Sequence, residues 1–247
     1  MNFPPGKTLE IETSSLCNRR CPTCIRNSCP DKEATAPWFE NNKMPTETIL
    51  NLVRDSMALG FNGVVCLSHY NEPLYDDRLV ELGREIKKMG EFGGIFFHSN
   101  GDLLTEEMAA ELDGVFDEID FTIYDSNLQD IHNKQAWITS LFQETEIVFC
   151  DSKHSITHFS PTANVEELSN RNINRPCFEP LYRIIFNHKG ELLFCCDEVF
   201  GNFDLGSYPD KPIEELWLGE KYQSLMEAVS KPGGRRKLPY CSTCPRG

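Results

Sequence analysis

The sequence has no long apolar run, no apolar leader segment and little positive charge. No stretch reaches the about 20 apolar residues that a membrane-spanning helix requires. Residues 1–6 show neither the basic group nor the apolar run of a secretory signal. Lys and Arg number 24 against 38 Asp and Glu, for a formal net charge of −14, which disfavours binding to a phosphate backbone or an anionic membrane. We therefore expect a cytoplasmic protein without a nucleic-acid or membrane partner.

Internal repeats and low-complexity tracts are also missing from the sequence. Its 247 residues, 40% of them apolar, are enough to bury a large core without the help of disulfides. The 11 Cys are an odd number. In a reducing compartment, spaced thiols are metal ligands more often than disulfide partners. Seven of the cysteines fall into two spaced groups, which we expect to bind metal.

Short apolar segments alternate with helical patterns over the first 150 residues. Strands are expected at 8–13, 63–68, 94–99, 118–124 and 145–150, and helices at 46–59, 76–89, 105–112 and 127–142. This alternation predicts parallel βαβ units. With a sixth strand near 156–159, the units predict an α/β fold, a partial barrel of the (β/α)6 type, because too little chain remains for eight units.

The pattern changes after Pro176. Two short strands at 182–187 and 191–196 flank a turn at 188–190, which indicates a β-hairpin. A helix is expected to open at Pro212, and the basic stretch 231–237 is interpreted as a flexible loop. We expect residues 1–172 to form the partial barrel and residues 173–247 a small α+β domain of hairpin plus helix.

The first cysteine group has the spacing C-x3-C-x2-C directly after the first expected strand. Its members are Cys17, Cys21 and Cys24. Soft thiolates favour zinc or an iron–sulfur cluster. Structural zinc takes four ligands, so three sulfurs leave one metal position open to a substrate or cofactor. The alternative is a structural zinc site closed by Cys29.

This motif at this place in a partial barrel resembles the signature of the radical S-adenosylmethionine (SAM) superfamily. The resemblance implies that Cys17, Cys21 and Cys24 hold a [4Fe-4S] cluster. It further implies that the open iron chelates the amino and carboxylate groups of SAM. Reduction then cleaves SAM to a 5′-deoxyadenosyl radical.

Three further segments resemble this family, and each follows a successive expected strand. The resemblance implies that residues of the second and third strand ends contact SAM, namely Asn71, Glu72, Pro73, Ser99 and Asn100. The segment Tyr124-Asp125 follows the fourth strand, and barrel enzymes build their sites at this edge. The sequence departs from the family where Asn71 replaces Gly and Thr23 replaces an aromatic, and it lacks a clear adenine motif near 147–148. The alternative for Ser99 and Asn100 is a capped turn.

The second cysteine group resembles the auxiliary-cluster domain called twitch, the short form of the SPASM domain. Its members are Cys177, Cys195, Cys241 and Cys244, with a hairpin glycine at Gly190. The resemblance implies a second [4Fe-4S] cluster with all four irons ligated by protein. The alternative is a four-cysteine zinc site.

The remaining polar residues give only weak candidates for catalysis. Cys196 follows Cys195 on an expected strand, so the two side chains should face opposite sides; Cys196 is either buried or a hydrogen-atom donor. Cys66 and Cys150 are expected to be small buried apolar residues. Other candidates to bind a polyol or act as a base are Tyr124, Asp125, His132, His154, His158 and Arg171.

The resemblance also implies a chemistry. A fully ligated auxiliary cluster accepts one electron, and short two-cluster family members oxidise a secondary alcohol of an aminocyclitol. We expect an oxygen-sensitive oxidoreductase that acts on a sugar, cyclitol or nucleotide sugar and receives electrons from a flavodoxin or ferredoxin. The alternatives are a peptide- or protein-modifying enzyme of the maturase type, an epimerase, and a non-catalytic zinc protein.

Overall fold

One curved sheet organises the computed structural model, which describes residues 7–21, 24, 42–90, 92–125, 127–150, 173–198, 202–242 and 244. The strand order across the sheet is β5-β4-β3-β2-β1-β6-β7. The strands are β1 (Thr8–Ile11), β2 (Val64–Cys66), β3 (Gly94–Ser99), β4 (Glu118–Thr122), β5 (Glu146–Cys150), β6 (Arg183–Phe186) and β7 (Leu192–Leu193). All neighbouring pairs are parallel except β6 with β7.

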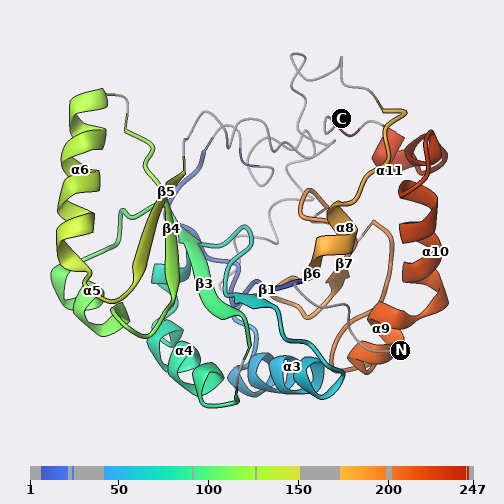
Figure 1. Cartoon of the computed structure of the whole chain (residues 1–247), viewed down its shortest axis with the longest axis horizontal. Coiled ribbons are helices and arrows are strands. Elements are labelled where there is room, and N and C mark those ends of the chain that lie inside the picture. Colours follow the sequence, from blue (N-terminus) through green and yellow to red (C-terminus); the bar gives the residue numbers. More distant parts are fainter. Residues whose placement is uncertain are drawn as a thin grey trace.

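Helices cover the outer face of this sheet, so that it forms part of a barrel (Figure 1). They follow the strands along the chain as α3 (Thr46–Ala58), α4 (Leu79–Lys87), α5 (Glu106–Leu112) and α6 (Leu128–Leu141). Local sequence fixes where they begin: Thr105 caps α5 by accepting a hydrogen bond from Met108 N, and Asn127 caps α6 by accepting one from Gln129 N. No described helix is both long and apolar enough to cross a membrane.

The core lies between the sheet and these helices. Alternate residues of β3 are buried, and Phe97 packs edge-on against Phe116 with ring centroids 4.7 Å apart. On α3 the apolar residues Ile49, Leu52 and Val53 share the face that packs inward. Each such side chain stabilises the fold by about 1.5–3 kcal/mol. The other set of strand residues faces the inside of the partial barrel and is far more polar.

The C-terminal segment contributes the hairpin β6–β7 to the same sheet. Its helices are α8 (Glu179–Tyr182), α9 (Ile213–Leu218), α10 (Glu220–Val229), η4 (Gly234–Lys237) and α11 (Pro239–Ser242). The turn requires Gly190, which has φ of 80° and whose added Cβ would lie 2.2 Å from Tyr208 O. Because β6 pairs with β1, residues on both sides of position 172 share this sheet.

The five strands and four helices expected before residue 150 are confirmed, as is the hairpin. The sixth parallel strand of the sheet is β6, whereas the strand expected at 156–159 lies outside the described residues. Two expectations were wrong. The helix after Pro212 is two helices that meet at Gly219, and the supposed flexible loop 231–237 contains the short helix η4.

Candidate active site

The first cysteine loop leaves the end of β1 and is held by backbone contacts. Cys24 N donates to Cys21 O at 3.0 Å, and Arg19 N donates to Cys17 Sγ at 3.5 Å. The three cysteines are half-buried and form no disulfide. Burial raises the pKa of Cys21, and the positive charge of Arg19 opposes this shift. The loop therefore offers three reduced sulfur donors with a cation beside them.

Arg19 fixes this loop to two other strand ends. Its guanidinium pairs with Asp102, with Nη2 2.9 Å from Oδ1, and stacks 5.2 Å from the ring centroid of Tyr124. Lys134 of α6 also reaches Asp102, at 2.7 Å. Tyr124 and the adjoining Asp125 thus lie beside the cysteine loop, where Asp125 contributes to the raised pKa of Arg19. Their proximity follows from the shared edge of the parallel strands.

Glu72 ties together the segments that follow β2 and β3. Its buried carboxylate accepts hydrogen bonds from Leu74 N at 3.1 Å, Ser99 Oγ at 2.8 Å and Asn100 N at 2.8 Å. Its own N–H donates to Leu16 O at 2.8 Å, next to Cys17. Burial raises the pKa of Glu72, although these bonds oppose the shift. Glu72 therefore positions the residues around the cysteine loop.

Asn71 and Asn100 connect the same segments through their amides. Asn71 Oδ1 accepts from His69 N at 3.0 Å, and its Nδ2 donates to Thr13 Oγ1 at 3.3 Å. Asn100 Nδ2 donates to Asn18 Oδ1 at 2.9 Å. Among the described non-glycine residues only Asp204 has a positive φ, so the backbone at Asn71 does not need glycine.

The capped turn considered for Ser99 and Asn100 is present. Ser99 Oγ accepts from Gly101 N at 3.0 Å, and Asn100 Oδ1 accepts from Asp102 N at 2.9 Å. The turn shapes the loop that holds Asp102 against Arg19. The capped turn is therefore compatible with the role in SAM binding that the resemblance implies for Ser99 and Asn100.

Two buried glutamates, Glu10 on β1 and Glu12 directly after it, were not recognised from the sequence. Glu10 lies 2.6 Å from His69 Nδ1 and 3.0 Å from Arg183 Nη1. Burial acts to raise the pKa of Glu10, but His69 and Arg183 outweigh it and bring the pKa to about 2. Glu12 lies 2.7 Å from His188 Nδ1 in the hairpin turn. The alternation of charged and apolar residues along 8–13 was the signal for an ionic inner face.

A second ionic group faces the inside of the partial barrel on β3 and β4. His98 and Asp120 are cross-strand partners, with Nδ1 3.0 Å from Oδ2, and 43% of the His98 side chain is exposed. Burial acts to lower the pKa of His98, but hydrogen bonds to Asp120 and Cys66 hold it well above its ordinary value. Asp120 Oδ1 is buried and has no hydrogen-bond partner among the described residues.

Cys66 belongs to this inner face and is not simply an apolar core residue. Its Sγ lies 3.3 Å from Ser68 Oγ, which in turn accepts a bond from His98 N at 2.9 Å. Cys150 is half-buried at the end of β5, and burial raises its pKa. Both cysteines were expected to be small buried apolar residues. Cys66 is buried but has a polar neighbour, and Cys150 is only half-buried.

Electrostatic interactions link the four cysteines of the second group in the structure. Burial raises the pKa of Cys241 to about 12, with further contributions from Cys244 and Cys177. Burial likewise raises the pKa of Cys195, and Cys244 adds to that shift. Such mutual effects require neighbouring sulfurs. The four segments are held by bonds such as Cys177 N to Val229 O at 2.8 Å and Arg235 Nη2 to Cys244 O at 3.2 Å.

These four reduced thiols, of which Cys241 is buried and the other three are half-buried, fit an iron–sulfur cluster, whose binding would keep them deprotonated. Within the described ranges, no three His, Cys, Asp or Glu side chains converge closely enough for a single metal ion. A [4Fe-4S] cluster distributes its ligands over separate irons, so its cysteines need not converge on one point. The donor set and its spacing in both groups are thus compatible with clusters.

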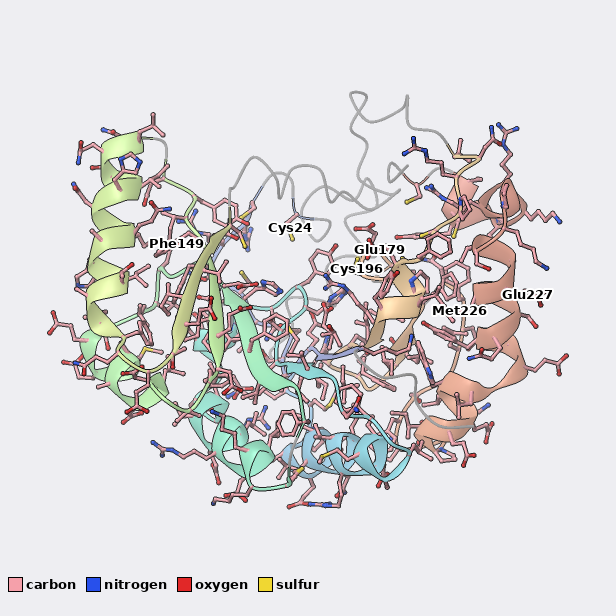
Figure 2. The ribbon with its side chains drawn as sticks, in the orientation of Figure 1. Cys24, Phe149, Glu179, Cys196, Met226 and Glu227 are labelled. Atoms are coloured by element: carbon pink, nitrogen blue, oxygen red, sulfur yellow. The ribbon has the colours of Figure 1, made fainter. Side chains whose placement is uncertain are left out.

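Cys196 does not lie on a strand, because β7 ends at Leu193. The argument that Cys195 and Cys196 face opposite sides of a strand was therefore wrong. Cys196 Sγ lies 3.9 Å from Glu179 Oε2, and Figure 2 shows both residues beside α8. His132 is exposed on α6, and the candidates Cys29, Thr23, His154, His158 and Arg171 lie outside the described residues.

Comparison with known families decides what this arrangement is. Residues 11–140, more than half of the chain, match the model of the Radical SAM superfamily. The chain belongs to the radical SAM superfamily. Residues 177–245 match the SPASM model, described as an iron-sulfur cluster-binding domain. The chain is thus a radical SAM enzyme whose cofactors are SAM and two [4Fe-4S] clusters, as expected, and the non-catalytic zinc protein is set aside.

Two curated proteins are similar in sequence. The S-adenosyl-L-methionine-dependent 2-deoxy-scyllo-inosamine dehydrogenase of Niallia circulans is 24% identical over 243 residues, covering 96% of this chain and 91% of that protein. The tungsten-containing aldehyde ferredoxin oxidoreductase cofactor-modifying protein of Pyrococcus furiosus (strain ATCC 43587 / DSM 3638 / JCM 8422 / Vc1) is 31% identical over 106 residues. That match covers 43% of this chain and 27% of the relative.

Solved structures share the fold. BtrN in complex with AdoMet and 2-DOIA superimposes with a TM-score of 0.76 at 19% identity, over 99% of this chain and 94% of that one. Native anSMEcpe with bound AdoMet gives a TM-score of 0.60 at 14% identity, over 98% and 88% of the two chains. The expected fold, a radical SAM partial barrel followed by a SPASM-like segment, is confirmed.

Proposed function

We propose that the enzyme oxidises an alcohol group of a small polar substrate, a sugar, cyclitol or nucleotide sugar. Cys17, Cys21 and Cys24 would hold the cluster that binds SAM, and Cys177, Cys195, Cys241 and Cys244 the auxiliary cluster. When bound, these groups supply a 5′-deoxyadenosyl radical for hydrogen-atom abstraction and an acceptor for one electron. The dehydrogenase from Niallia circulans supports this proposal, because the similarity covers 96% of this chain and 91% of that protein.

The observation that carries the redox role is that four reduced cysteines of the second group interact electrostatically with one another. Four thiolates complete the ligation of a [4Fe-4S] cluster and leave no iron for substrate. A site that cannot bind substrate, and that Tyr70 links to the first cysteine loop, suits electron transfer. Tyr70 supports that placement, since its raised pKa reflects burial first and then the charges of Asp197, Cys196 and Cys24.

The inner face of the sheet supports a substrate that is rich in hydroxyl groups. His98 would donate a hydrogen bond to a substrate oxygen, because 43% of its side chain is exposed and its Nδ1 lies 3.0 Å from Asp120 Oδ2, which favours the charged imidazolium. Asp120 Oδ1, buried and without a partner among the described residues, would accept a bond from a substrate hydroxyl. We assign these two residues to substrate orientation. Asn71, Glu72, Pro73, Ser99 and Asn100 would shape the SAM site, with Glu72 acting through the bonds it accepts.

We further propose the division into residues 1–172 and 173–247, with an electron donor of the flavodoxin or ferredoxin type. The proposed setting is the cytoplasm, without a nucleic-acid or membrane partner. The net charge of −14 supports this setting. One alternative is epimerisation, which needs a thiol as hydrogen-atom donor. For that role we prefer Cys66 to Cys196, because Cys66 belongs to the inner face of the sheet.

The test is an anaerobic incubation of reconstituted enzyme with SAM, dithionite and a panel of aminocyclitols, sugars, nucleotide sugars and peptides. We expect one member of the polyol group to raise 5′-deoxyadenosine formation and to yield a carbonyl product in equal amount. A product that is an epimer of its substrate would instead support epimerisation. Stimulation by peptides alone would replace the small-substrate proposal with a peptide-modifying one.

A further inference from the structure

Positive charge is concentrated at one end of this acidic chain. Residues 228–247 contain five Lys and Arg and no Asp or Glu, although the whole chain has a net charge of −14. The five are Lys231, Arg235, Arg236, Lys237 and Arg246. The same 20 residues contain Cys241 and Cys244 of the auxiliary group. The local reversal of charge thus coincides with a cluster site.

The structure places one of these charges, Arg235, directly beside Cys244, and three others on the surface of the same segment. Arg235 is buried and donates from Nη2 to Cys244 O at 3.2 Å. Lys231, Arg236 and Lys237 are exposed, and we call these three side chains the basic patch. Figure 1 shows α10 and α11, which flank η4 in the chain, at the edge of the molecule away from α4 and α6.

The backbone under the basic patch is well fixed. Gly233 has φ of 72° and donates from N to Asn174 O at 2.9 Å. At Gly234 an added Cβ would lie 1.6 Å from Ala228 O, so the turn packs against the end of α10. η4 then sets Arg236 and Lys237 on the surface. A structured turn of this kind presents charge at a defined position.

Few acidic groups neutralise the patch. Lys231 pairs with Glu227 at 2.5 Å, an exposed contact between residues four apart, and such pairs contribute little. Figure 2 shows Glu227 on the outer side of α10. In the described part of the chain, no carboxylate forms an ion pair with Arg236 or Lys237. The patch therefore keeps most of its positive potential.

We propose that the basic patch docks a small acidic one-electron carrier protein, of the flavodoxin or ferredoxin type, at the auxiliary cluster. The proposal rests on the proposed function. Alcohol oxidation transfers a hydrogen atom to the 5′-deoxyadenosyl group and then releases one electron and one proton from the substrate. The oxidised carrier accepts the electron and leaves reduced by one electron, while the proton goes to solvent.

Charge complementarity selects this partner over others. Opposite charges speed association and orient the two proteins, and these effects weaken as salt rises. A long nucleic acid would meet the strongly acidic remainder of the chain, whereas a small carrier needs to contact only the patch. Without the patch, an acidic carrier would be repelled by the net charge of this enzyme.

The test compares two double variants with the same change of charge. Arg236→Glu/Lys237→Glu reverses the patch, and Arg84→Glu/Lys88→Glu reverses two exposed cations on the distant helix α4. Binding of oxidised flavodoxin to each holoenzyme is measured anaerobically by calorimetry between low and high salt. We expect the patch variant to bind at least about tenfold more weakly with a flatter salt dependence, and the α4 variant to bind within about twofold of the parent.

Equal binding by the two variants would overturn the docking proposal. The proposal would also be overturned if an RNA oligonucleotide bound the parent more tightly than flavodoxin does and did not bind the patch variant. A single turnover started by dithionite leaves the substrate electron on the auxiliary cluster and needs no carrier, so both variants should retain it. Failure of the parent to form oxidised product with dithionite would count against the proposed function, whereas the binding comparison judges the docking surface by itself.

Discussion

The hydroxyl of Tyr70 donates a hydrogen bond of 3.2 Å to the backbone carbonyl of Cys196. Tyr70 belongs to the segment between β2 and η2 (Pro73–Tyr75), and Cys196 follows Cys195 of the auxiliary group. Burial raises the pKa of Tyr70 well above its usual range, so the phenol remains a donor. This one bond joins the segment assigned to SAM with the loop assigned to the auxiliary cluster.

Replacing Tyr70 with Phe removes this bond and keeps the ring. We expect SAM cleavage to continue while the yield of oxidised product per 5′-deoxyadenosine falls, because the two loops lose their link. Loss of one hydrogen bond should lower the free energy of unfolding by about 0.5–1.5 kcal/mol. Tyr75→Phe, at a half-exposed position on η2, is the matched control and should keep the parental yield. An unchanged yield in Tyr70→Phe would show that the bond has no part in coupling.

Glu72→Gln tests the carboxylate that organises the SAM edge. In glutamine, an NH2 group replaces one of the two carboxylate oxygens. It would then face a donor instead of accepting from it, either Asn100 N or the pair Leu74 N and Ser99 Oγ. We expect weaker SAM binding by calorimetry and a loss of about 1–3 kcal/mol in unfolding free energy. Glu81→Gln on the exposed side of α4 should change neither. Parental SAM affinity in the Glu72 variant would contradict the positioning role.

The His98–Asp120 pair predicts a pH dependence of stability. Because the folded state holds the pKa of His98 above its unfolded value near 6.5, the pair stabilises fully below about pH 6.5. That contribution is lost as the pH rises through the raised pKa. The difference in unfolding free energy between parent and His98→Gln should therefore shrink from pH 6 to pH 9. His132→Gln on α6 should show no such trend, and a constant difference for His98 would refute the ion pair.

The first cysteine group can be tested by iron content. Replacing Cys17, Cys21 and Cys24 together with Ala should reduce iron from about eight to about four per chain after anaerobic reconstitution. Reductive cleavage of SAM should disappear, because the open iron that binds it is lost. Cleavage at the parental rate in this triple variant would rule out the assignment.

Much of this site could be predicted because its chemistry depends on local spacing. The C-x3-C-x2-C motif can be recognised from its spacing. The residues after each strand can be placed near it, because the carboxyl ends of parallel strands meet at one edge of the sheet. Glu72 could be predicted to lie there, but its bonds to Ser99 and Asn100 depend on how two loops turn in space. Spacing does not contain that information.

The inner face shows where sequence reading fails. Cys66 looks like part of an apolar strand, yet its Sγ lies 3.3 Å from Ser68 Oγ, and the register pairs it with Phe96, two residues before His98. A buried ion pair such as His98–Asp120 depends on strand order, which sequence alone does not fix. β6 illustrates the same point, since a hairpin was expected but its pairing with β1 was not.

The most direct test of the account is the double variant Cys241→Ser/Cys244→Ser, provided that circular dichroism shows the parental fold and iron analysis shows one remaining cluster. With the identified substrate, 5′-deoxyadenosine and oxidised product are quantified in the same single-turnover sample. We predict that 5′-deoxyadenosine still forms while oxidised product is absent, because the electron acceptor is gone. Product formed at the parental rate would contradict it and would leave the auxiliary cluster a structural role only.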